Sequence, residues 1–248
     1  MKKCLIFPIC VLITFISCVK ENVINKPPND YYNQQVGASA NDLLSNSKYT
    51  KLKLEIQYMP GYSLDANTIT NLQNLLKVRL NKSDGIEIIT TQIGSSGKAI
   101  YSIDDISAIE TNKRTSFDTS HTIALYILIV DGDYSTSGVL GVAYKNTSMV
   151  LIGKTIHNNS GGLGQASRVK LESAVINHEI GHVLGLVNVG SSLQSAHEDK
   201  SHVGHCDNKD CLMYYASETT DFLGFLLTGS IPDFDANCKA DLKANGGK

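Results

Sequence analysis

The chain has 248 residues, of which 42% are hydrophobic and 19% charged, so it can bury one sizeable core without requiring a second domain. Its formal net charge is −2 and no basic run stands out, which gives no electrostatic basis for binding nucleic acid. The composition is typical of a globular domain and argues against a protein that works by charge attraction to polyanions.

The N-terminal segment begins with two lysines and continues in an apolar run from Cys4 to Ile16. This run is too short, and ends too abruptly, to predict a membrane span. With the small Ser17 before Cys18, the segment resembles a bacterial lipoprotein signal, which implies removal of residues 1–17 and a lipid anchor on Cys18. An ordinary secretory signal cut nearby is the alternative. Both interpretations predict export, and the first predicts a cell-envelope protein held at the outer membrane or cell surface.

Residues 18–48 are polar, contain the only Pro-Pro pair and show no sustained hydrophobic period. This composition predicts a flexible tether between the lipid anchor and the folded part of the chain. A single domain is expected over residues 49–248.

The first half of the expected domain alternates between strands and helices. Apolar residues at every second position predict strands at 51–59 and 85–93. Between them, apolar residues at helical spacing predict a helix for which Asp65 is the expected N-cap. A second helix is predicted from Ser102, with Asp105 three residues later as an approximate capping box.

The second half leads to one long helix. Residues 122–130 are apolar on both alternations, which predicts a central strand covered on both faces. Two short apolar runs, 138–146 and 148–154, are expected to pair as strands, and a loop rich in Gly, Asn and Ser follows at 156–167. A helix is predicted from Arg168 to about residue 186. This order of elements predicts a mixed α/β (α+β) domain.

The long helix carries the motif H-E-x-x-H in His178, Glu179 and His182. Residues four apart lie one above the other on a helix, so the two histidines can chelate one ion. Glu179 is one residue on from His178, so its carboxylate cannot easily be a third ligand on the same face and is better placed to hold a metal-bound water and take its proton. Nitrogen ligands with an open position fit zinc. Gly185 follows where a sharp turn out of the helix is needed.

A third ligand is needed, and the residues alone do not identify it. Asn188 stands where a third histidine would complete H-E-x-x-H-x-x-G-x-x-H, but a carboxamide oxygen is a weak zinc ligand. His197, His202 and His205 follow downstream, and composition does not choose among them.

The string HCDNKDCLM, from His205 to Met213, reads H-C-x4-C-x-M. With the helix motif it resembles the archaemetzincin family of zinc metallopeptidases, in which H-E-x-x-H-x-x-G-x-x-H-C-x4-C-x-M is continuous. The departure is that the last histidine comes at 205 instead of 188, which is 17 residues later. We refer to residues 189–204 as the insertion. The match is specific over 171–213, and upstream only the general order of elements agrees.

The resemblance implies a single metzincin-like catalytic domain, with a mixed twisted sheet, an active-site helix and a small helical C-terminal subdomain. It implies zinc ligands at His178, His182 and His205, with Glu179 as general base. Met213 would lie in the Met-turn beneath the metal.

The next two residues, Tyr214 and Tyr215, are candidates for contact with the substrate or its oxyanion. A packing role is the alternative for both, since a tyrosine after a core methionine is often part of the core.

The family pattern also implies a second, structural zinc on four cysteines. Here three are present, Cys206, Cys211 and Cys238, and Asp235 stands in place of the fourth. In an oxidising compartment a disulfide among the three is the simpler expectation. A zinc held by the three thiolates with Asp235 is the alternative.

The resulting expectation is a lipid-anchored zinc peptidase of the cell envelope that hydrolyses a peptide or protein substrate. The competing hypothesis is a non-catalytic surface lipoprotein that uses the same scaffold to bind a metal or a partner. The retained Glu179 argues for the enzyme, because a binding protein has no need of a carboxylate beside two metal ligands.

Overall fold

The computed structural model describes residues 31–220, 223–226 and 230–248. The expected signal segment 1–17 and the expected lipidation residue Cys18 lie outside these ranges. Within the described residues, no helix has the length and apolar character needed to cross a membrane.

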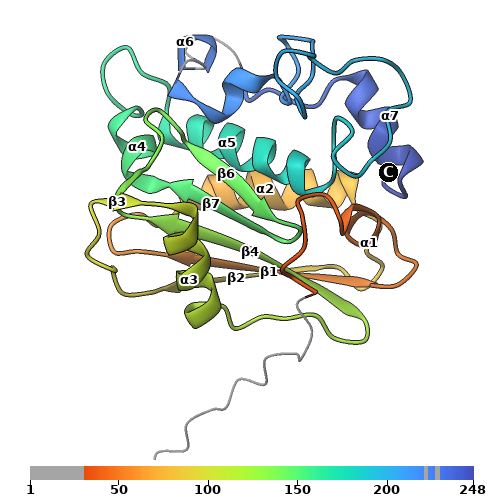
Figure 1. Cartoon of the computed structure of the whole chain (residues 1–248), viewed down its shortest axis with the longest axis horizontal. Coiled ribbons are helices and arrows are strands. Elements are labelled where there is room, and N and C mark those ends of the chain that lie inside the picture. The colour runs from red at the N-terminus through yellow and green to blue at the C-terminus, as the bar shows by residue number, and fades with distance from the viewer. Residues whose placement is uncertain (1–30, 221–222, 227–229) are drawn as a thin grey trace, which may run out of the picture.

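A five-stranded sheet forms the centre of the molecule, in the order β2-β1-β4-β7-β6 (Figure 1). Four strands run parallel and the edge strand β6 is antiparallel to β7. The strands are β1 (Lys51–Tyr58), β2 (Ile86–Gln92), β4 (Thr122–Val130), β6 (Gly141–Lys145) and β7 (Ser148–Ile152). A separate parallel pair joins β3 (Ile100–Tyr101) to β5 (Asp133–Tyr134).

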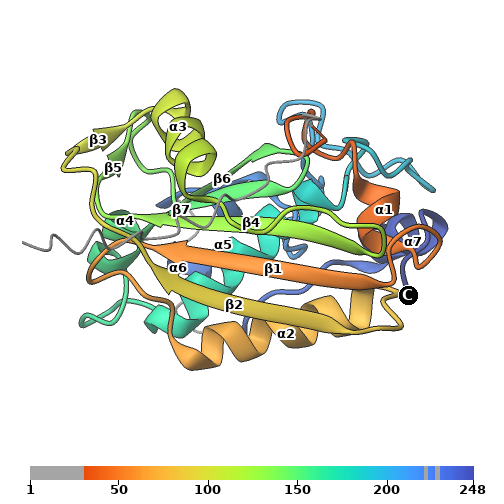
Figure 2. The same cartoon turned by 90° about the horizontal axis from the view of Figure 1, so that it is seen from below.

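Helices cover both faces of the sheet, as Figures 1 and 2 show. On one face lie α2 (Ala66–Arg79) and α5 (Arg168–Val183), and on the other lies α3 (Ile103–Lys113). The C-terminal part is helical, with η1 (Tyr215–Glu218), α6 (Leu223–Leu226) and α7 (Ala236–Ala244). The predicted mixed α/β class, with a helical C-terminal subdomain, is confirmed.

The central strand β4 divides the core into two layers. Its odd-numbered residues, such as Ile127, pack with α2 and α5, whereas Tyr126 and Leu128 belong to the cluster on the α3 side. Alternate side chains of a strand point to opposite faces, so an apolar residue at every position is what two covered faces require. The sequence prediction for this strand is confirmed.

The predicted helix starts are also confirmed. The Asp65 side chain accepts a hydrogen bond from the main-chain N–H of Asn67 at the start of α2. Ser102 and Asp105 exchange side-chain-to-backbone hydrogen bonds in both directions at the start of α3, which makes a complete capping box.

The predicted tether extends too far along the chain. Residues 31–48 lie against the domain and include α1 (Ala40–Leu44), whose Leu43 and Leu44 are buried. Asn146, in the turn between β6 and β7, bonds this segment through Gln34, Tyr31 and Ser39. Two leucines in a short polar stretch give no period, so the sequence pattern missed the burial.

A short helix, α4 (Gly153–Asn158), replaces the end of the predicted strand 148–154 and the start of the predicted loop 156–167. It has only six residues and no side-chain cap. With Ile156 buried against the core and few other apolar positions, it carries too little helical pattern to be recognised.

Candidate metal centre

The helix α5 supplies the rigid base of the centre. Its N-cap is Ser167, whose side chain accepts a hydrogen bond from the Lys170 N–H, and most residues of the helix are buried. At its end, Leu186 N–H donates to Gly181 O and Gly185 N–H to His182 O, the pair of bonds that defines a Schellman motif. Gly185 has φ of 75°, so the predicted glycine turn is present.

Three histidines converge beside this helix. His178 and His182 come from α5 and His205 from the chain beyond the insertion, and one ligand nitrogen from each lies within 4.8 Å of the others. The ring centroids of His178 and His205 are 5.4 Å apart, and those of His182 and His205 are 4.9 Å apart. The structure therefore brings together the three histidines that the sequence resemblance had grouped.

The insertion folds back on itself and so returns the chain to the helix. Glu198 pairs with Cys206 in an antiparallel bridge, and the Asp199 N–H donates to the carbonyl of His205 at 2.8 Å. The N–H of His205 in turn donates to the carbonyl of His202 at 3.0 Å. A closed turn of this kind explains how a histidine 17 positions late can still reach the pair on α5.

The nitrogen positions fit a tetrahedral metal. The Nε2 atoms of His178 and His182 are 3.1 Å apart. Two nitrogens bound to one zinc at ~2.0–2.1 Å are separated by roughly 3.3 Å in a tetrahedron. His178 Nδ1 lies 2.7 Å from the carbonyl of Leu212, an acceptor only, so Nδ1 carries the proton and Nε2 keeps its lone pair for an ion.

The electrostatics favour the neutral, metal-binding form of His182. Burial, together with the neighbouring His178 and His205, holds the pKa of His182 well below its ordinary value. A neutral imidazole is the form that binds a metal.

Glu179 lies between the helix and the edge strand β6. It is fully buried, and its Oε2 accepts the main-chain N–H of Ala143 at 2.6 Å. The strand can approach this closely because residue 141 is glycine: a Cβ there would lie 3.0 Å from Glu179 Cγ and 2.7 Å from Val175 Cγ1. The carboxylate is thus fixed against the edge strand of the sheet, one residue after His178 on α5.

Met213 lies directly under α5. A Cβ at Gly181, one residue before His182, would lie 2.2 Å from the Met213 sulfur. Met213 is fully buried, and its carbonyl accepts the N–H of Cys206, which follows His205 in the chain. The residue therefore packs beneath the candidate centre, in the position that the resemblance implied.

The remaining candidate residues lie outside the three-histidine group. The ring of Tyr215 stacks on His202 with centroids 3.6 Å apart, and Tyr214 packs against Tyr215. Asn188 is exposed and has φ of 67°, a left-handed conformation that asparagine tolerates. The part of Tyr214 and Tyr215 in oxyanion or substrate contact stays a prediction.

The three described cysteines are thiols in this structure, so the expected disulfide is not formed. The sulfurs of Cys211 and Cys238 are 3.6 Å apart, well beyond the ~2.05 Å of a disulfide bond. Cys206 and Cys238 instead lie in a buried group with His197 and Asp235.

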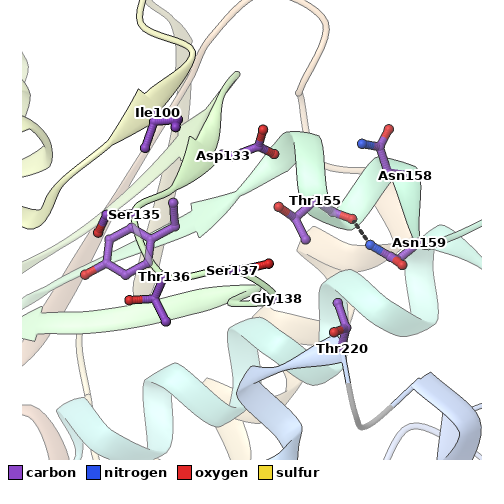
Figure 3. Close-up of a pocket in the computed structure, with 11 residues that line it drawn as sticks. Ile100, Asp133, Ser135, Thr136, Ser137, Gly138, Thr155, Asn158, Asn159 and Thr220 are labelled. Carbon is purple, nitrogen blue, oxygen red and sulfur yellow. Dashed lines mark hydrogen bonds between the residues drawn. The ribbon is translucent and has the colours of Figure 1, made fainter.

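A polar pocket of about 460 Å³ lies beside the start of the edge strand (Figure 3). Gly138 and Thr220 line one side, and Asp133 and Thr155 another. The Thr220 N–H donates to the carbonyl of Gly138, and Val139 pairs with Thr219, so the chain after the Met-turn contacts the segment just before the edge strand here.

Sequence reasoning missed two features of the site. The contact between Ala143 and Glu179 joins residues 36 positions apart in the chain. It forms only because β6 packs alongside α5. The burial of His197 was also missed, because the insertion reads as a polar loop; the one available signal was a histidine within nine residues of Cys206.

Comparison of the sequence with family models and with curated proteins gives no match. Among solved structures, the archaemetzincin from Methanopyrus kandleri superposes with a TM-score of 0.53 at 14% identity, covering 79% of this chain and 96% of that one. The metalloproteinase-II from Bacteroides fragilis gives a TM-score of 0.42 at 18% identity, covering 89% of this chain and 58% of that one. The first of these superpositions shows that the chain has an archaemetzincin-like fold.

Proposed function

We propose that this protein is a zinc-dependent peptidase that hydrolyses peptide bonds outside the cytoplasm. The observation that carries the proposal is the meeting of His178, His182 and His205 at one point, with the Glu179 carboxylate on the same helix. Three histidine ligands leave a fourth position open, which is typical of catalytic rather than structural zinc sites.

The residues have distinct parts in this proposal. His178, His182 and His205 hold the zinc, and Leu212 orients the first of them through its carbonyl. The zinc, when bound, polarises the scissile carbonyl and lowers the pKa of a water. Glu179 takes the proton of that water and passes it to the leaving amine.

The edge strand β6 is the proposed docking element for the substrate. Its other side pairs with β7, so one row of main-chain groups faces away from the sheet, on the side of Glu179. An extended peptide can add to such an edge as a further strand, which places its backbone beside the catalytic carboxylate. The polar pocket at Gly138 and Thr220 is then placed to receive a small or polar side chain of the substrate.

The N-terminal sequence supports the proposed location of the activity. A lipid on Cys18 would hold the domain at the membrane of the cell envelope, where the substrates are exported or surface proteins and peptides. Incorporation of a fatty-acid analogue into wild type, but not into Cys18→Ser, tests this part independently of the chemistry.

The test of the chemistry compares wild type with Glu179→Ala at equal zinc content on a broad peptide library. Loss of the general base is expected to lower the rate by about 10²–10⁴-fold without removing zinc. If the wild type binds zinc but cleaves nothing, and Glu179→Ala behaves identically, the non-catalytic binding protein is the better description.

A further inference from the structure

A second group of metal-ligating side chains is buried away from the three histidines. It contains His197 from the insertion, Cys206 from the segment after it, and Asp235 and Cys238 from the start of α7. One ligand atom from each lies within 4.8 Å of the others. His197, Cys206 and Cys238 are each no more than 1% exposed, so the three side chains meet in the interior of the protein.

The distances within this group match a tetrahedral site. His197 Nδ1 lies 3.5 Å from Cys206 Sγ and 4.0 Å from Cys238 Sγ, and Asp235 Oδ2 lies 3.5 Å from Cys206 Sγ. With Zn–S of ~2.3 Å and Zn–N or Zn–O of ~2.0–2.2 Å, ligand atoms on one tetrahedral zinc are separated by roughly 3.5–3.8 Å. Cys211, whose sulfur is 3.6 Å from that of Cys238, adds a third thiol beside the group.

The orientation of His197 is fixed by a second carboxylate. Its Nε2 lies 2.8 Å from Oδ2 of Asp241, which is fully buried, and the other oxygen of Asp241 accepts the N–H of Gln194. A histidine that ligates a metal through one nitrogen commonly donates from the other to a carboxylate. Nδ1 is thereby directed at the two sulfurs.

The thiol and carboxylate groups are held together with little access to solvent. Cys206 and Cys238 are fully buried, and Asp235 accepts the main-chain N–H of Cys238 through Oδ1 while its Oδ2 faces the sulfur of Cys206. A bound cation would offset the cost of burying these groups in their charged forms, because buried charges are costly unless they are paired or coordinated. Soft thiolate ligands select zinc-like ions.

We propose that His197, supplied by the insertion, is a ligand of the second, structural zinc that the family pattern implies, and that it completes a set with Cys206, Asp235 and Cys238. Asp235 stands where the family pattern has a fourth cysteine. The structure brings His197 into the same site. The insertion thus provides a ligand that ties it to α7. Because Cys206 directly follows His205, an ion here also fixes the backbone that presents His205 to the first centre.

Zinc content of the full chain tests this inference, and it does so without relying on peptidase activity. The double variant His178→Ala/His182→Ala removes the first centre and is expected to retain about one zinc per chain. Adding His197→Ala is expected to remove most of that zinc, whereas adding His202→Ala, in the same insertion but outside the group, is expected to leave it. A folded double variant that holds no zinc overturns the proposal, as does zinc that His197→Ala leaves unchanged.

Cobalt substitution identifies the ligands even if His197→Ala folds poorly. The double variant loaded with Co²⁺ should show thiolate-to-cobalt charge-transfer absorption, and Cys238→Ser should weaken it. Cobalt bound without such absorption contradicts thiolate ligation.

Alkylation of the zinc-loaded chain, mapped by mass spectrometry, gives a third measurement. Cys206 and Cys238 should be protected, and should react after chelation without any reductant. A Cys211–Cys238 disulfide that opens only with reductant overturns the site. If these measurements exclude the second zinc, the proposed peptidase activity is unaffected. If the protein proves inactive as a peptidase, the second zinc site is unaffected, so the two proposals are tested separately.

Discussion

The main-chain N–H of Ala143 donates a hydrogen bond of 2.6 Å to Oε2 of Glu179, which joins the edge strand β6 directly to the proposed general base. This N–H points away from β7, so it belongs to the row of groups that an added strand would use. An incoming peptide carbonyl and the Glu179 carboxylate therefore share one donor. Substrate pairing with β6 is expected to release the carboxylate for proton transfer.

Removing the N–H of Ala143 tests whether this group binds the substrate carbonyl as well as the Glu179 carboxylate. Ala143→Pro removes the N–H without breaking a bond to β7, and proline is tolerated on edge strands. We expect zinc content to be unchanged and kcat/KM to fall about two- to tenfold, through a higher KM, because a hydrogen bond to a neutral peptide carbonyl contributes about 0.5–1.5 kcal/mol. Ala143→Ser keeps the N–H and is the matched control. Equal kinetics for the proline and serine variants would contradict a role for this donor.

The contact between Gly181 and Met213 predicts a strict size limit on α5. A Cβ at position 181 would lie 2.2 Å from the Met213 sulfur and 3.0 Å from a ring carbon of Phe234. Gly181→Ala should therefore lower the free energy of unfolding by about 1–3 kcal/mol, as overpacking does. Urea denaturation measures it, with Gly94→Ala as control because a Cβ at 94 meets no atom within 4 Å. A neutral or stabilising Gly181→Ala would show that the helix and the Met-turn are less closely packed.

The buried charge cluster beneath the edge strand predicts a large stability effect. Glu110 is fully buried and lies 2.8 Å from Arg114 and 2.9 Å from Lys145, the last residue of β6. Glu110→Gln leaves two cations without their counter-charge and should cost about 3–5 kcal/mol of unfolding free energy.

Glu87→Gln provides the matched control for this cluster. Glu87 pairs with Lys51 at the surface, with about 40% of each side chain exposed, so its loss should cost only about 0–1 kcal/mol. Similar values for the two variants, measured by urea denaturation, would contradict the importance of burial.

Asn146 predicts how the N-terminal segment is held. This buried side chain accepts the N–H of Gln34 and donates to the carbonyl of Tyr31 and to the hydroxyl of Ser39. Asn146→Ala removes these bonds and should raise amide hydrogen exchange across residues 31–44, while β4 stays protected. Unchanged exchange in that segment would mean that α1 packing alone holds it.

The sequence predicted those parts of the molecule whose pattern is local. β4 is apolar from Ile123 to Val130 because both of its faces are covered, and the two residues of the Ser102–Asp105 capping box are three positions apart, so the sequence predicted both features. α1 and α4 were missed because few residues carry their apolar contacts, and their stability comes from the neighbouring sheet and helices.

The candidate site divides in the same way. His178, Glu179 and His182 follow from helical spacing, whereas His205 was reached only through resemblance, because the insertion separates it from the helix. The place of His197 beside Cys206 and Cys238 could not be predicted, since it depends on how the insertion folds against α7. A polar loop in sequence gives no sign of a buried imidazole.

The central claim is that the insertion returns His205 to the helix as the third ligand of a catalytic zinc. The most direct measurement is zinc content and peptide hydrolysis of His205→Ala beside His202→Ala. We predict that His205→Ala loses zinc from the three-histidine centre and loses hydrolysis, whereas His202→Ala keeps its zinc. A His205→Ala variant with full zinc and full activity would contradict the account.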